Sequence, residues 1–214
     1  AVFNKDNYPV VDHYTYVLGG DGCMMEGISS EAFSLAGTLG LGKLIVLYDS
    51  NRISIEGSTD IAFRENVEER MRAFGFHAIG AAIEAAKADT EHPSFITITT
   101  EIGYGCPAKQ GKASAHGEPL GEENVKALRE TLNWPSEEAF FVPQEVYEHF
   151  SRLAEEKADV EAAWNVMFAA YCEEYPEMEA LWDKYHKDVD AKAMLEKKEL
   201  WLEKDKAEAT RSLS

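Results

Sequence analysis

The chain of 214 residues is poor in basic side chains, in cysteine and in long apolar runs. Its 21 Lys and Arg residues are outnumbered by 39 Asp and Glu residues, which gives a formal net charge of −18. A nucleic-acid-binding protein needs a basic surface, so this charge argues against that function. The longest apolar run near the centre covers residues 44–48, far short of the roughly 20 residues of a membrane-spanning helix. We therefore expect neither nucleic acid nor a membrane as a partner.

Cysteine is equally scarce. The chain has three, Cys23, Cys106 and Cys172, which lie far apart and are odd in number. Buried thiols in a reducing compartment explain this pattern better than a disulfide framework or a zinc site.

No basic segment followed by an apolar stretch opens the chain, so we expect no secretion signal and a cytoplasmic location. The chain starts at Ala1 without an initiator Met and soon enters strand-like sequence, which is expected of a fragment.

The apolar content is sufficient for a folded core, with 45% hydrophobic and 11% aromatic residues. Residues 1–120 alternate short β-rich runs with helical segments and glycine-rich turns, whereas residues 121–214 are almost wholly helical in pattern. The first region predicts an α/β fold, a doubly wound and mainly parallel sheet flanked by helices. The second predicts an all-helical extension, a scaffold or linker whose charged faces are solvated.

Three strands and a first helix are visible in the α/β region. Residues 13–18 and 94–100 are rich in β-branched and aromatic side chains, and residues 44–48 form a continuous apolar run typical of a buried parallel strand. Small and apolar residues at helical spacing predict a helix from Gly27 to Leu39. Further helices are expected at residues 66–74, 79–88, 121–132, 143–157, 159–174 and 176–209.

One position breaks the alternation of strands and helices. Only residues 75–78 separate the helices expected at 66–74 and 79–88, and four residues leave no room for the strand that the alternation requires. Either the chain departs from its pattern here or a stretch has been lost. We expect the second, a segment omitted at residues 77–79, between His77 and Ile79.

Polar residues stand at the ends of two expected strands. Gly20, Asp21 and Gly22 follow the first strand, and Asn51 follows the second. In an open parallel sheet, ligands bind beyond the carboxyl ends of the strands. Asp21 and Asn51 offer the oxygen ligands that Mg²⁺ takes and shares with phosphates. Gly22 lets the backbone approach a phosphate, and the helix beginning near Gly27 offers free N–H groups to an anion. A tight turn and an ordinary loop Asn are the alternative, but the matching strand ends favour a magnesium-bridged diphosphate site.

The residues around this pair resemble the transketolase family. A Gly-Asp-Gly motif followed about 30 residues later by Asn is shared by many thiamine-diphosphate enzymes, whereas its extended form and the His-Gly-Glu-Pro-Leu-Gly motif are specific to transketolases. The resemblance covers essentially the whole chain, including the helical tail. The segments that carry it are GDGCMMEG at 20–27, SLAGTL at 34–39, YDSNRISIEG at 48–57, AFGFH at 73–77, IGYG at 102–105 and AHGEPLG at 115–121.

The resemblance implies thiamine diphosphate and a divalent metal, Mg²⁺ or Ca²⁺, as cofactors. Asp21, Asn51 and the backbone carbonyl of Ile53 resemble the protein ligands of this metal. Gly20 and Gly22 belong to the motif that binds the cofactor, and Gly22 resembles a backbone donor to the diphosphate. Ser50 departs from the family, which usually has a second aspartate there, and this change alters the surroundings of the metal ligands.

Four further residues take roles by the same resemblance. Ile55 and Ile102 resemble apolar residues that lie near the cofactor rings. His116 resembles a catalytic histidine near the diphosphate and the substrate hydroxyls. Glu26 resembles an acidic residue in the interface network that links paired active sites. His116 also stands in a glycine-rich loop after a strand, a position where catalytic residues collect.

The function implied is that of a transketolase, a transferase that moves a two-carbon ketol unit from a ketose phosphate to an aldose phosphate. The resemblance covers only part of the first of three family domains, so an incomplete domain is expected. This chain would supply the metal–diphosphate half of the site and be inactive alone. A pyrimidine-binding domain or subunit would complete it, in a homodimer or a split-subunit assembly.

The transketolase family has two features that this chain lacks. The family carries a strand and an acidic Asp-Gly-x-Asp turn where this chain passes from His77 to Ala78, which supports an omitted segment. The N-terminal part of the domain is also missing.

Two alternatives for the function remain open: another thiamine-diphosphate enzyme, of the dehydrogenase or deoxyxylulose-phosphate synthase type, or a folded fragment that does not catalyse.

Overall fold

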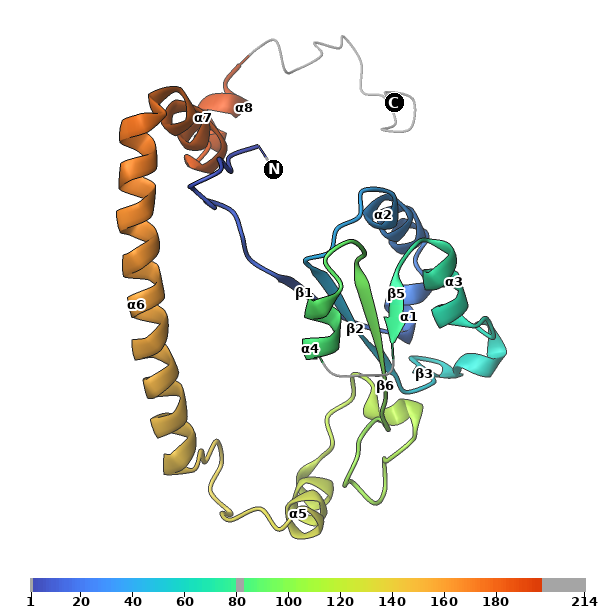
Figure 1. Cartoon of the computed structure of the whole chain (residues 1–214). Helices are drawn as coiled ribbons and strands as arrows, with labels where there is room; N and C mark the ends of the chain where they lie inside the picture. Colours follow the sequence, from blue (N-terminus) through green and yellow to red (C-terminus); the bar gives the residue numbers. More distant parts are fainter. Residues whose placement is uncertain (1, 80–82, 198–214) are drawn as a thin grey trace. The chain divides into compact units, whose positions relative to one another are not determined.

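The computed structural model describes residues 2–79 and 83–197 of the chain. These residues divide into two compact units, which are described separately (Figure 1). One unit spans residues 12–148 and contains the main sheet, and the other combines the N-terminal residues up to Val11 with the residues from His149 onward.

The first unit is built on a four-stranded parallel sheet. Its strands are β1 (Thr15–Gly20), β2 (Leu44–Ser50), β5 (His77–Ile79) and β6 (Ser94–Thr99), arranged in the order β1-β2-β6-β5. Every pairing in this sheet is parallel, which confirms the predicted fold class. The three long strands lie where the β-rich runs of the sequence predict them.

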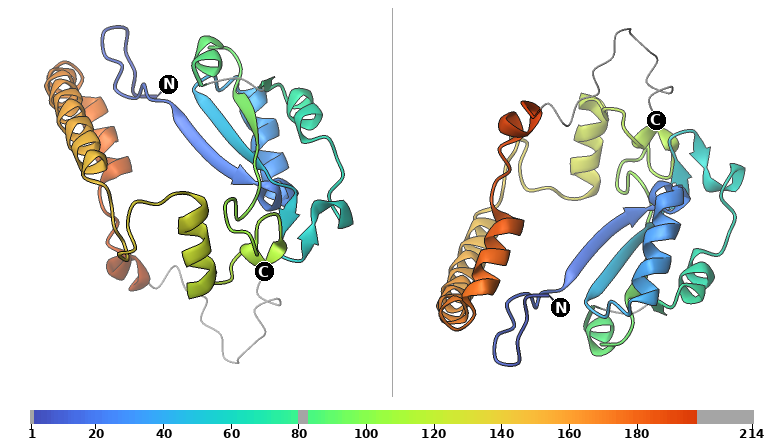
Figure 2. Two further views of the ribbon diagram at one scale, coloured as in Figure 1. Left: turned by 90° about the horizontal axis from the view of Figure 1, so that it is seen from below. Right: turned by 90° about the horizontal axis from the view of Figure 1, so that it is seen from above.

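Helices cover both faces of this sheet. Alternate residues of β2 point to opposite faces, so that Val46 and Tyr48 join one core cluster and Ile45 and Leu47 join the other. The first cluster includes residues of α2 (Gly27–Thr38) and α3 (Val67–Ala73), and the second includes Ala86 of α4 (Ile83–Ala88). The blue ribbon of α2 runs alongside the strands in both views of Figure 2.

Local sequence explains where α3 begins and where α2 and α3 end. The side-chain oxygen of Asn66 accepts a hydrogen bond from the Glu69 N–H at 3.2 Å and so caps the start of α3. Gly40, with φ of 60°, and Gly75, with φ of 90°, follow α2 and α3 in the left-handed region that glycine adopts most easily. The helix expected at 66–74 is thereby confirmed.

The gap between the two expected helices contains a short strand. Within the described residues, the helix predicted for 79–88 is α4 (Ile83–Ala88), whereas His77–Ile79 form β5, paired with Ser94–Ile96 of β6. The expectation that no strand fits was therefore wrong, because three residues are enough to pair with half of β6. In the described part of the chain, Thr97–Thr99 have no partner strand on that side. The segment expected to be missing between His77 and Ile79 stays a prediction.

The C-terminal half is helical, as predicted, but its helices divide differently. The helices expected at 143–157 and 159–174 form one helix, α6 (Gln144–Glu174), because no glycine or proline interrupts them. Instead of one helix over 176–209, the structure has α7 (Pro176–His186) and α8 (Ala191–Leu195). The Asp190 side chain caps the start of α8, and residues 198–209 lie outside the described part. The helix predicted at 121–132 is confirmed as α5 (Glu122–Thr131).

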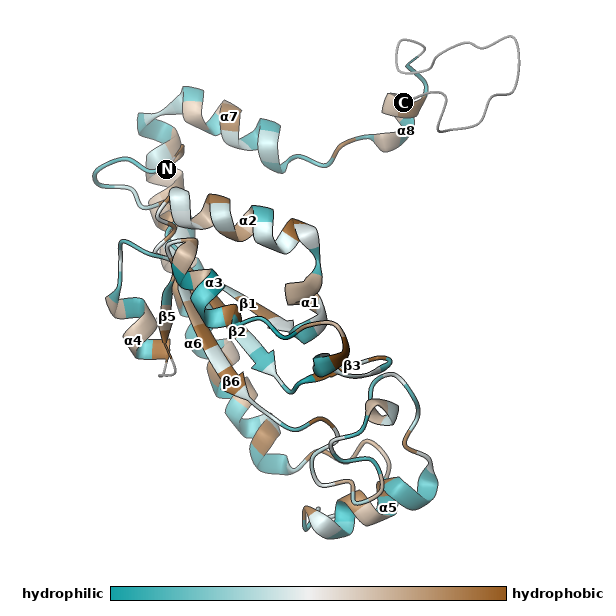
Figure 3. Ribbon diagram, turned by 90° about the vertical axis from the view of Figure 1, so that its right-hand side faces the viewer, coloured by the Kyte–Doolittle hydropathy of each residue, from teal (hydrophilic) through white to brown (hydrophobic). Residues whose placement is uncertain are grey.

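Aromatic side chains of α6 tie the N-terminal segment to the helical unit. The Tyr171 hydroxyl donates to the Phe3 carbonyl at 2.8 Å, and the Trp164 indole N–H donates to the Val10 carbonyl at 3.0 Å. Elsewhere the helices are of mixed hydropathy, as α5 and α7 show in Figure 3. Within the described ranges, no helix has both the length and the apolar character needed to cross a membrane.

The three cysteines are free. Cys106 is buried, as expected, and Cys172 is half-buried, where burial raises the pKa of its thiol. Cys23 is exposed, so the expectation of buried thiols was wrong at this position. It lies in the short helix that follows β1, and that helix has only two buried residues.

Helix α2 approaches the end of α3 closely at Gly37. A Cβ atom at Gly37 would lie 1.6 Å from the carbonyl oxygen of Phe74, so Gly37→Ala forces the two helices apart. We expect the free energy of unfolding, measured by urea denaturation, to fall by about 3 kcal/mol, the upper range for overpacked sites.

Gly27→Ala is the matched control in the same helix. A Cβ at Gly27 would meet no atom within 4 Å, and alanine favours helix, so stability should stay unchanged or rise by up to about 1 kcal/mol. Equal losses in the two variants would show that the close approach of Gly37 does not control the packing of α2.

Candidate active site

The Gly-Asp-Gly motif at residues 20–22 and Asn51 lie at the same edge of the sheet. In the parallel register of β1 and β2, Gly20 is aligned with Asp49, so the two strands end together. Asp21 follows Gly20, and Asn51 follows the last residue of β2. Both side chains therefore start beyond the carboxyl ends of neighbouring parallel strands, where open α/β sheets bind their ligands.

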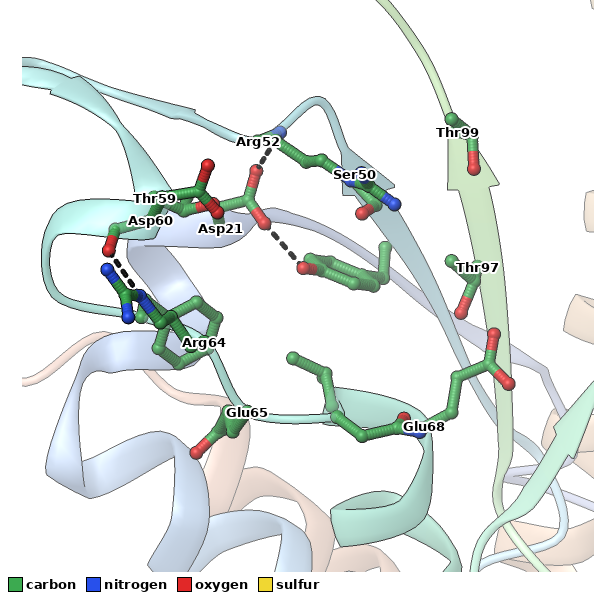
Figure 4. Close-up of a pocket in the computed structure, with 14 residues that line it drawn as sticks. Asp21, Ser50, Arg52, Thr59, Asp60, Arg64, Glu65, Glu68, Thr97 and Thr99 are labelled. Carbon is green, nitrogen blue, oxygen red and sulfur yellow. Dashed lines mark hydrogen bonds between the residues drawn. The ribbon is translucent and has the colours of Figure 1, made fainter.

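The Asp21 carboxylate is buried and held at both oxygens. Its residue is 4% exposed, the Tyr48 hydroxyl donates to Oδ1 at 2.5 Å, and the Arg52 backbone N–H donates to Oδ2 at 2.7 Å (Figure 4). Both donors are neutral. Among the residues that the structure describes, no Lys, Arg or His side chain forms an ion pair with Asp21. Because a buried carboxylate without a cationic partner is costly, this position favours a bound cation.

Tyr48 is the donor that the sequence analysis missed. Its ring lies in the core, with its centroid 5.4 Å from that of Phe95. Burial, followed by the hydrogen bond to Asp21, raises the pKa of Tyr48 to about 12. The phenol therefore keeps its proton at neutral pH and acts as a hydrogen-bond donor. Its signal in the sequence was a polar hydroxyl at the end of an otherwise apolar strand.

The loop after β2 has a strained residue at its centre. Arg52 has φ of 62°, a left-handed conformation that a non-glycine residue adopts at a cost. The loop passes from β2 to the small strand β3 (Ile53–Ser54), which pairs with β4 (Gly57–Ser58). The Asn51 side-chain oxygen accepts the Ile53 N–H at 3.0 Å, which orients the amide and leaves its oxygen a second lone pair.

The backbone around Gly22 differs from the predicted arrangement. The helix near Gly27 was expected to be the first after β1, but α1 (Asp21–Met25) precedes it, so Asp21 and Gly22 lie in the first turn of a five-residue helix. Five residues are too few to show an apolar period, which is why the sequence did not reveal α1. A Cβ at Gly22 would meet no atom within 4 Å, so nothing in the described structure fills the space beside this backbone.

Four predicted residues stand apart from this cluster. Ile55 is 70% exposed in the turn between β3 and β4, and Ile102 is half-buried in the loop after β6. His116 is exposed just after the 3₁₀ turn Ala113–Ala115, and Glu26 is exposed immediately before α2. Among the described residues, no hydrogen bond or ion pair joins His116 or Glu26 to Asp21 or Asn51. Hydrogen bonds connect Asp21 with Tyr48 and the loop after β2, and within that loop Asn51 is bonded to Ile53.

A cavity of about 550 Å³ opens beside Asp21. Polar side chains from the loop between β4 and α3 and from β6 face it, as Figure 4 shows for Arg64, Glu65, Thr97 and Thr99. The two threonines come from the end of β6, which pairs with β2 on one side and, among the described residues, has no partner strand on the other. The sequence did not single out these two cavity-lining residues, although Thr97 and Thr99 share one face of β6 by the alternation of strand residues. A polar cavity next to the buried carboxylate suits a polar ligand.

The donor set fits a divalent metal and a diphosphate. The carboxylate of Asp21 and the amide oxygen of Asn51 are hard oxygen donors, and Asp21 has no cationic partner among the described residues. The open backbone at Gly22 leaves room for an anion next to them.

The chain is similar to known proteins over most of its length. The family model of the transketolase thiamine diphosphate binding domain matches residues 1–190. The chloroplastic transketolase-1 of Arabidopsis thaliana is 52% identical over 189 residues, which cover 83% of this chain and 25% of the relative. The transketolase of Halalkalibacterium halodurans is 46% identical over 189 residues, which cover 83% of this chain and 28% of the relative.

Solved structures show the same likeness. The Pichia stipitis transketolase in complex with sedoheptulose 7-phosphate has a TM-score of 0.77 and 43% identity, covering 83% of this chain and 28% of that one. The Leishmania mexicana transketolase has a TM-score of 0.78 and 39% identity, covering 85% and 29%. The chain thus spans little more than a quarter of the length of the relatives it matches. With a family model matched over most of its residues, the chain belongs to the transketolase family.

Proposed function

We propose that this chain supplies the metal–diphosphate half of a transketolase active site. The reaction is the thiamine-diphosphate-dependent transfer of a two-carbon ketol unit from a ketose phosphate to an aldose phosphate. The observation that carries the proposal is the buried Asp21 carboxylate, which has only neutral partners in the described structure and adjoins the open backbone of Gly22. The crystallised complex of the Pichia stipitis relative with sedoheptulose 7-phosphate supports sugar phosphates as the substrate class.

The metal in this proposal is Mg²⁺ or Ca²⁺. Asp21, Asn51 and the backbone carbonyl of Ile53 would hold it, because hard divalent cations take carboxylate, amide and carbonyl oxygens. Tyr48 and the Arg52 N–H fix the carboxylate of Asp21 and leave it further lone pairs for the metal. Groups that orient a ligand in this way contribute to metal affinity without touching the metal.

The diphosphate would lie against the backbone of Gly20 and Gly22. The chain carries a net charge of −18, so an anionic ligand needs a local positive field. The divalent cation and the backbone N–H groups beside it provide that field. When bound, thiamine diphosphate supplies the electron sink for carbon–carbon cleavage, and the residues of this chain hold and orient it.

The other predicted residues require additional protein. Ile55 and Ile102 would lie near the cofactor rings, His116 near the substrate hydroxyls, and Glu26 at an interface between paired sites. Three of these side chains are exposed, which leaves them accessible to a ligand or to a second polypeptide. We propose that a pyrimidine-binding domain or subunit completes the site, in a homodimer or a split-subunit assembly, and that the chain alone shows no ketol transfer. For location we propose a reducing compartment such as the cytoplasm, which suits three free thiols.

The metal site is tested by Asp21→Asn, which keeps the shape of the side chain but removes its charge. Loss of an anionic ligand should weaken magnesium-dependent binding of thiamine diphosphate on the order of 100-fold, measured by calorimetry on the chain. Asp60→Asn is the control, because Asp60 lines the same cavity but is exposed. Unchanged cofactor affinity in Asp21→Asn would show that Asp21 is not a ligand of the metal.

The orienting hydroxyl is tested by Tyr48→Phe. The variant loses one hydrogen bond to a charged group, so unfolding free energy should fall by about 1.5–3 kcal/mol and magnesium affinity by about tenfold. Tyr16→Phe is the control, since Tyr16 lies on β1 with an exposed ring. If both variants bind magnesium as the native chain does, the hydroxyl of Tyr48 has no part in holding the metal ligand.

His116 is tested in an enzyme completed by fusing this chain to the remaining portion of a transketolase relative. His116→Ala should lower turnover at least about tenfold, because general acid–base groups contribute 10²–10⁴-fold, and should leave the melting temperature unchanged because the residue is exposed. His13→Ala, at another exposed histidine, should affect neither quantity. Parallel losses of turnover and stability in His116→Ala would indicate a structural histidine.

A further inference from the structure

A single guanidinium from α3 contacts three separate segments of the first unit. Arg70 Nη2 donates to the Met24 carbonyl at 2.8 Å, and Nη1 donates to the Ser30 hydroxyl at 2.9 Å. Nη2 also forms an ion pair with Glu65 at 2.8 Å. These partners belong to the last turn of α1, the first turn of α2 and the loop before α3. The Arg70 side chain is 21% exposed, so most of it is shielded from water.

The end of α1 depends on such side-chain contacts. A helix of five residues makes few internal hydrogen bonds, so its terminal carbonyls need partners from elsewhere. The Ser29 hydroxyl donates to the Cys23 carbonyl at 2.6 Å, and Arg70 donates to the next carbonyl, that of Met24. A cation at the C-terminal end of a helix is also favoured by the helix dipole.

The segment that these contacts hold joins α1 to α2 and is here called the elbow, residues 24–27. Glu26, which adopts an extended conformation between the two helices, is its central residue. The elbow is continuous with Asp21 and Gly22 at the other end of α1. Asp21 is fixed by Tyr48 and Arg52 at the start of this short helix, whereas at its end Arg70 adds a charged hydrogen bond to the burial of the Met24 side chain.

We propose that Arg70 is a positioning residue that sets the geometry of the elbow, and through it the placement of Asp21 and Gly22 for cofactor binding and of Glu26 for the interface between paired sites. The link to the cofactor rests on the proposed function, whereas the effect on the elbow does not. Arginine suits this task because its planar fork reaches a carbonyl and a hydroxyl at once, whereas lysine offers a single charged nitrogen.

Hydrogen exchange of backbone amides in the full chain, without metal or cofactor, tests the elbow directly. Arg70→Gln should raise the exchange of amides in residues 23–29 about tenfold or more, while amides of β6 keep their protection, because the loss is local. Arg70→Lys should give a smaller increase. The same variants are then titrated with thiamine diphosphate and Mg²⁺ by calorimetry, where Arg70→Gln should bind about tenfold more weakly and Arg70→Lys should recover part of the affinity.

Two control variants separate the effect of losing the hydrogen bonds to the elbow from the effect of losing a charge and from the effect of losing the ion pair. Arg72→Gln removes the same charge from the same helix, but Arg72 is 51% exposed and pairs with Glu68, so residues 23–29 should exchange as before. Glu65→Gln removes the ion-pair partner and leaves the bonds to Met24 and Ser30, so the elbow should stay protected.

The outcomes separate the two proposals. Unchanged exchange of residues 23–29 in Arg70→Gln, or an equal increase in β6, overturns the positioning role. If Arg70→Gln does not fold, Arg70→Lys and Ser30→Ala carry the test, and native protection of the elbow in both overturns it as well. If the native chain binds no thiamine diphosphate while Arg70→Gln loosens the elbow, the proposed function fails and the structural role of Arg70 stands.

Discussion

The carboxylate of Asp21 is the point at which the chain segments of the first unit converge. Through its two oxygens it connects the beginning of α1 with the Tyr48 hydroxyl on β2 and with the Arg52 N–H in the following loop. These contacts fix the ends of two parallel strands relative to one another and give the Asn51 loop its course. The same group has no cationic partner within the described residues, so the residue that organises this edge of the sheet also carries an uncompensated charge. In the proposed site, ligand binding and the stability of the fold would therefore be coupled at one side chain.

Long, regular elements of this fold could be predicted from the sequence because periodicity and composition repeat over enough residues. The parallel strands β1, β2 and β6 and the helix α2 are examples. The short elements escaped prediction for the opposite reason. Helix α1 has five residues and β5 has three, so neither displays a period, and each exists because of tertiary contacts: Met24 in the core for α1, and the pairing with β6 for β5. The single helix α6 was divided in two by prediction although no breaking residue separates its halves.

The site divides along similar lines. Asp21 and Asn51 could be predicted because a polar residue after a buried strand is a local signal, and the sheet geometry brings such residues to one edge. The groups that orient them could not, since the reach of the Tyr48 hydroxyl and the left-handed φ of Arg52 depend on how distant segments pack. In the proposed function an acidic chain binds a diphosphate, which requires a local positive field. There the buried carboxylate would provide this field indirectly, by binding a divalent cation whose charge exceeds its own.

The three-residue length of β5 has a consequence for how this sheet tolerates change. The pairing of His77–Ile79 with Ser94–Ile96 already sets the register of the two strands. Along Thr97–Thr99, on the side of β5, the described residues offer backbone groups with no partner strand. Inserted residues that continued β5 would pair with Thr97–Thr99, which lie beside the cavity, without shifting this register. A change in chain length at this point would therefore alter the cavity while Asp21 and Asn51, beyond the ends of β1 and β2, stay in place.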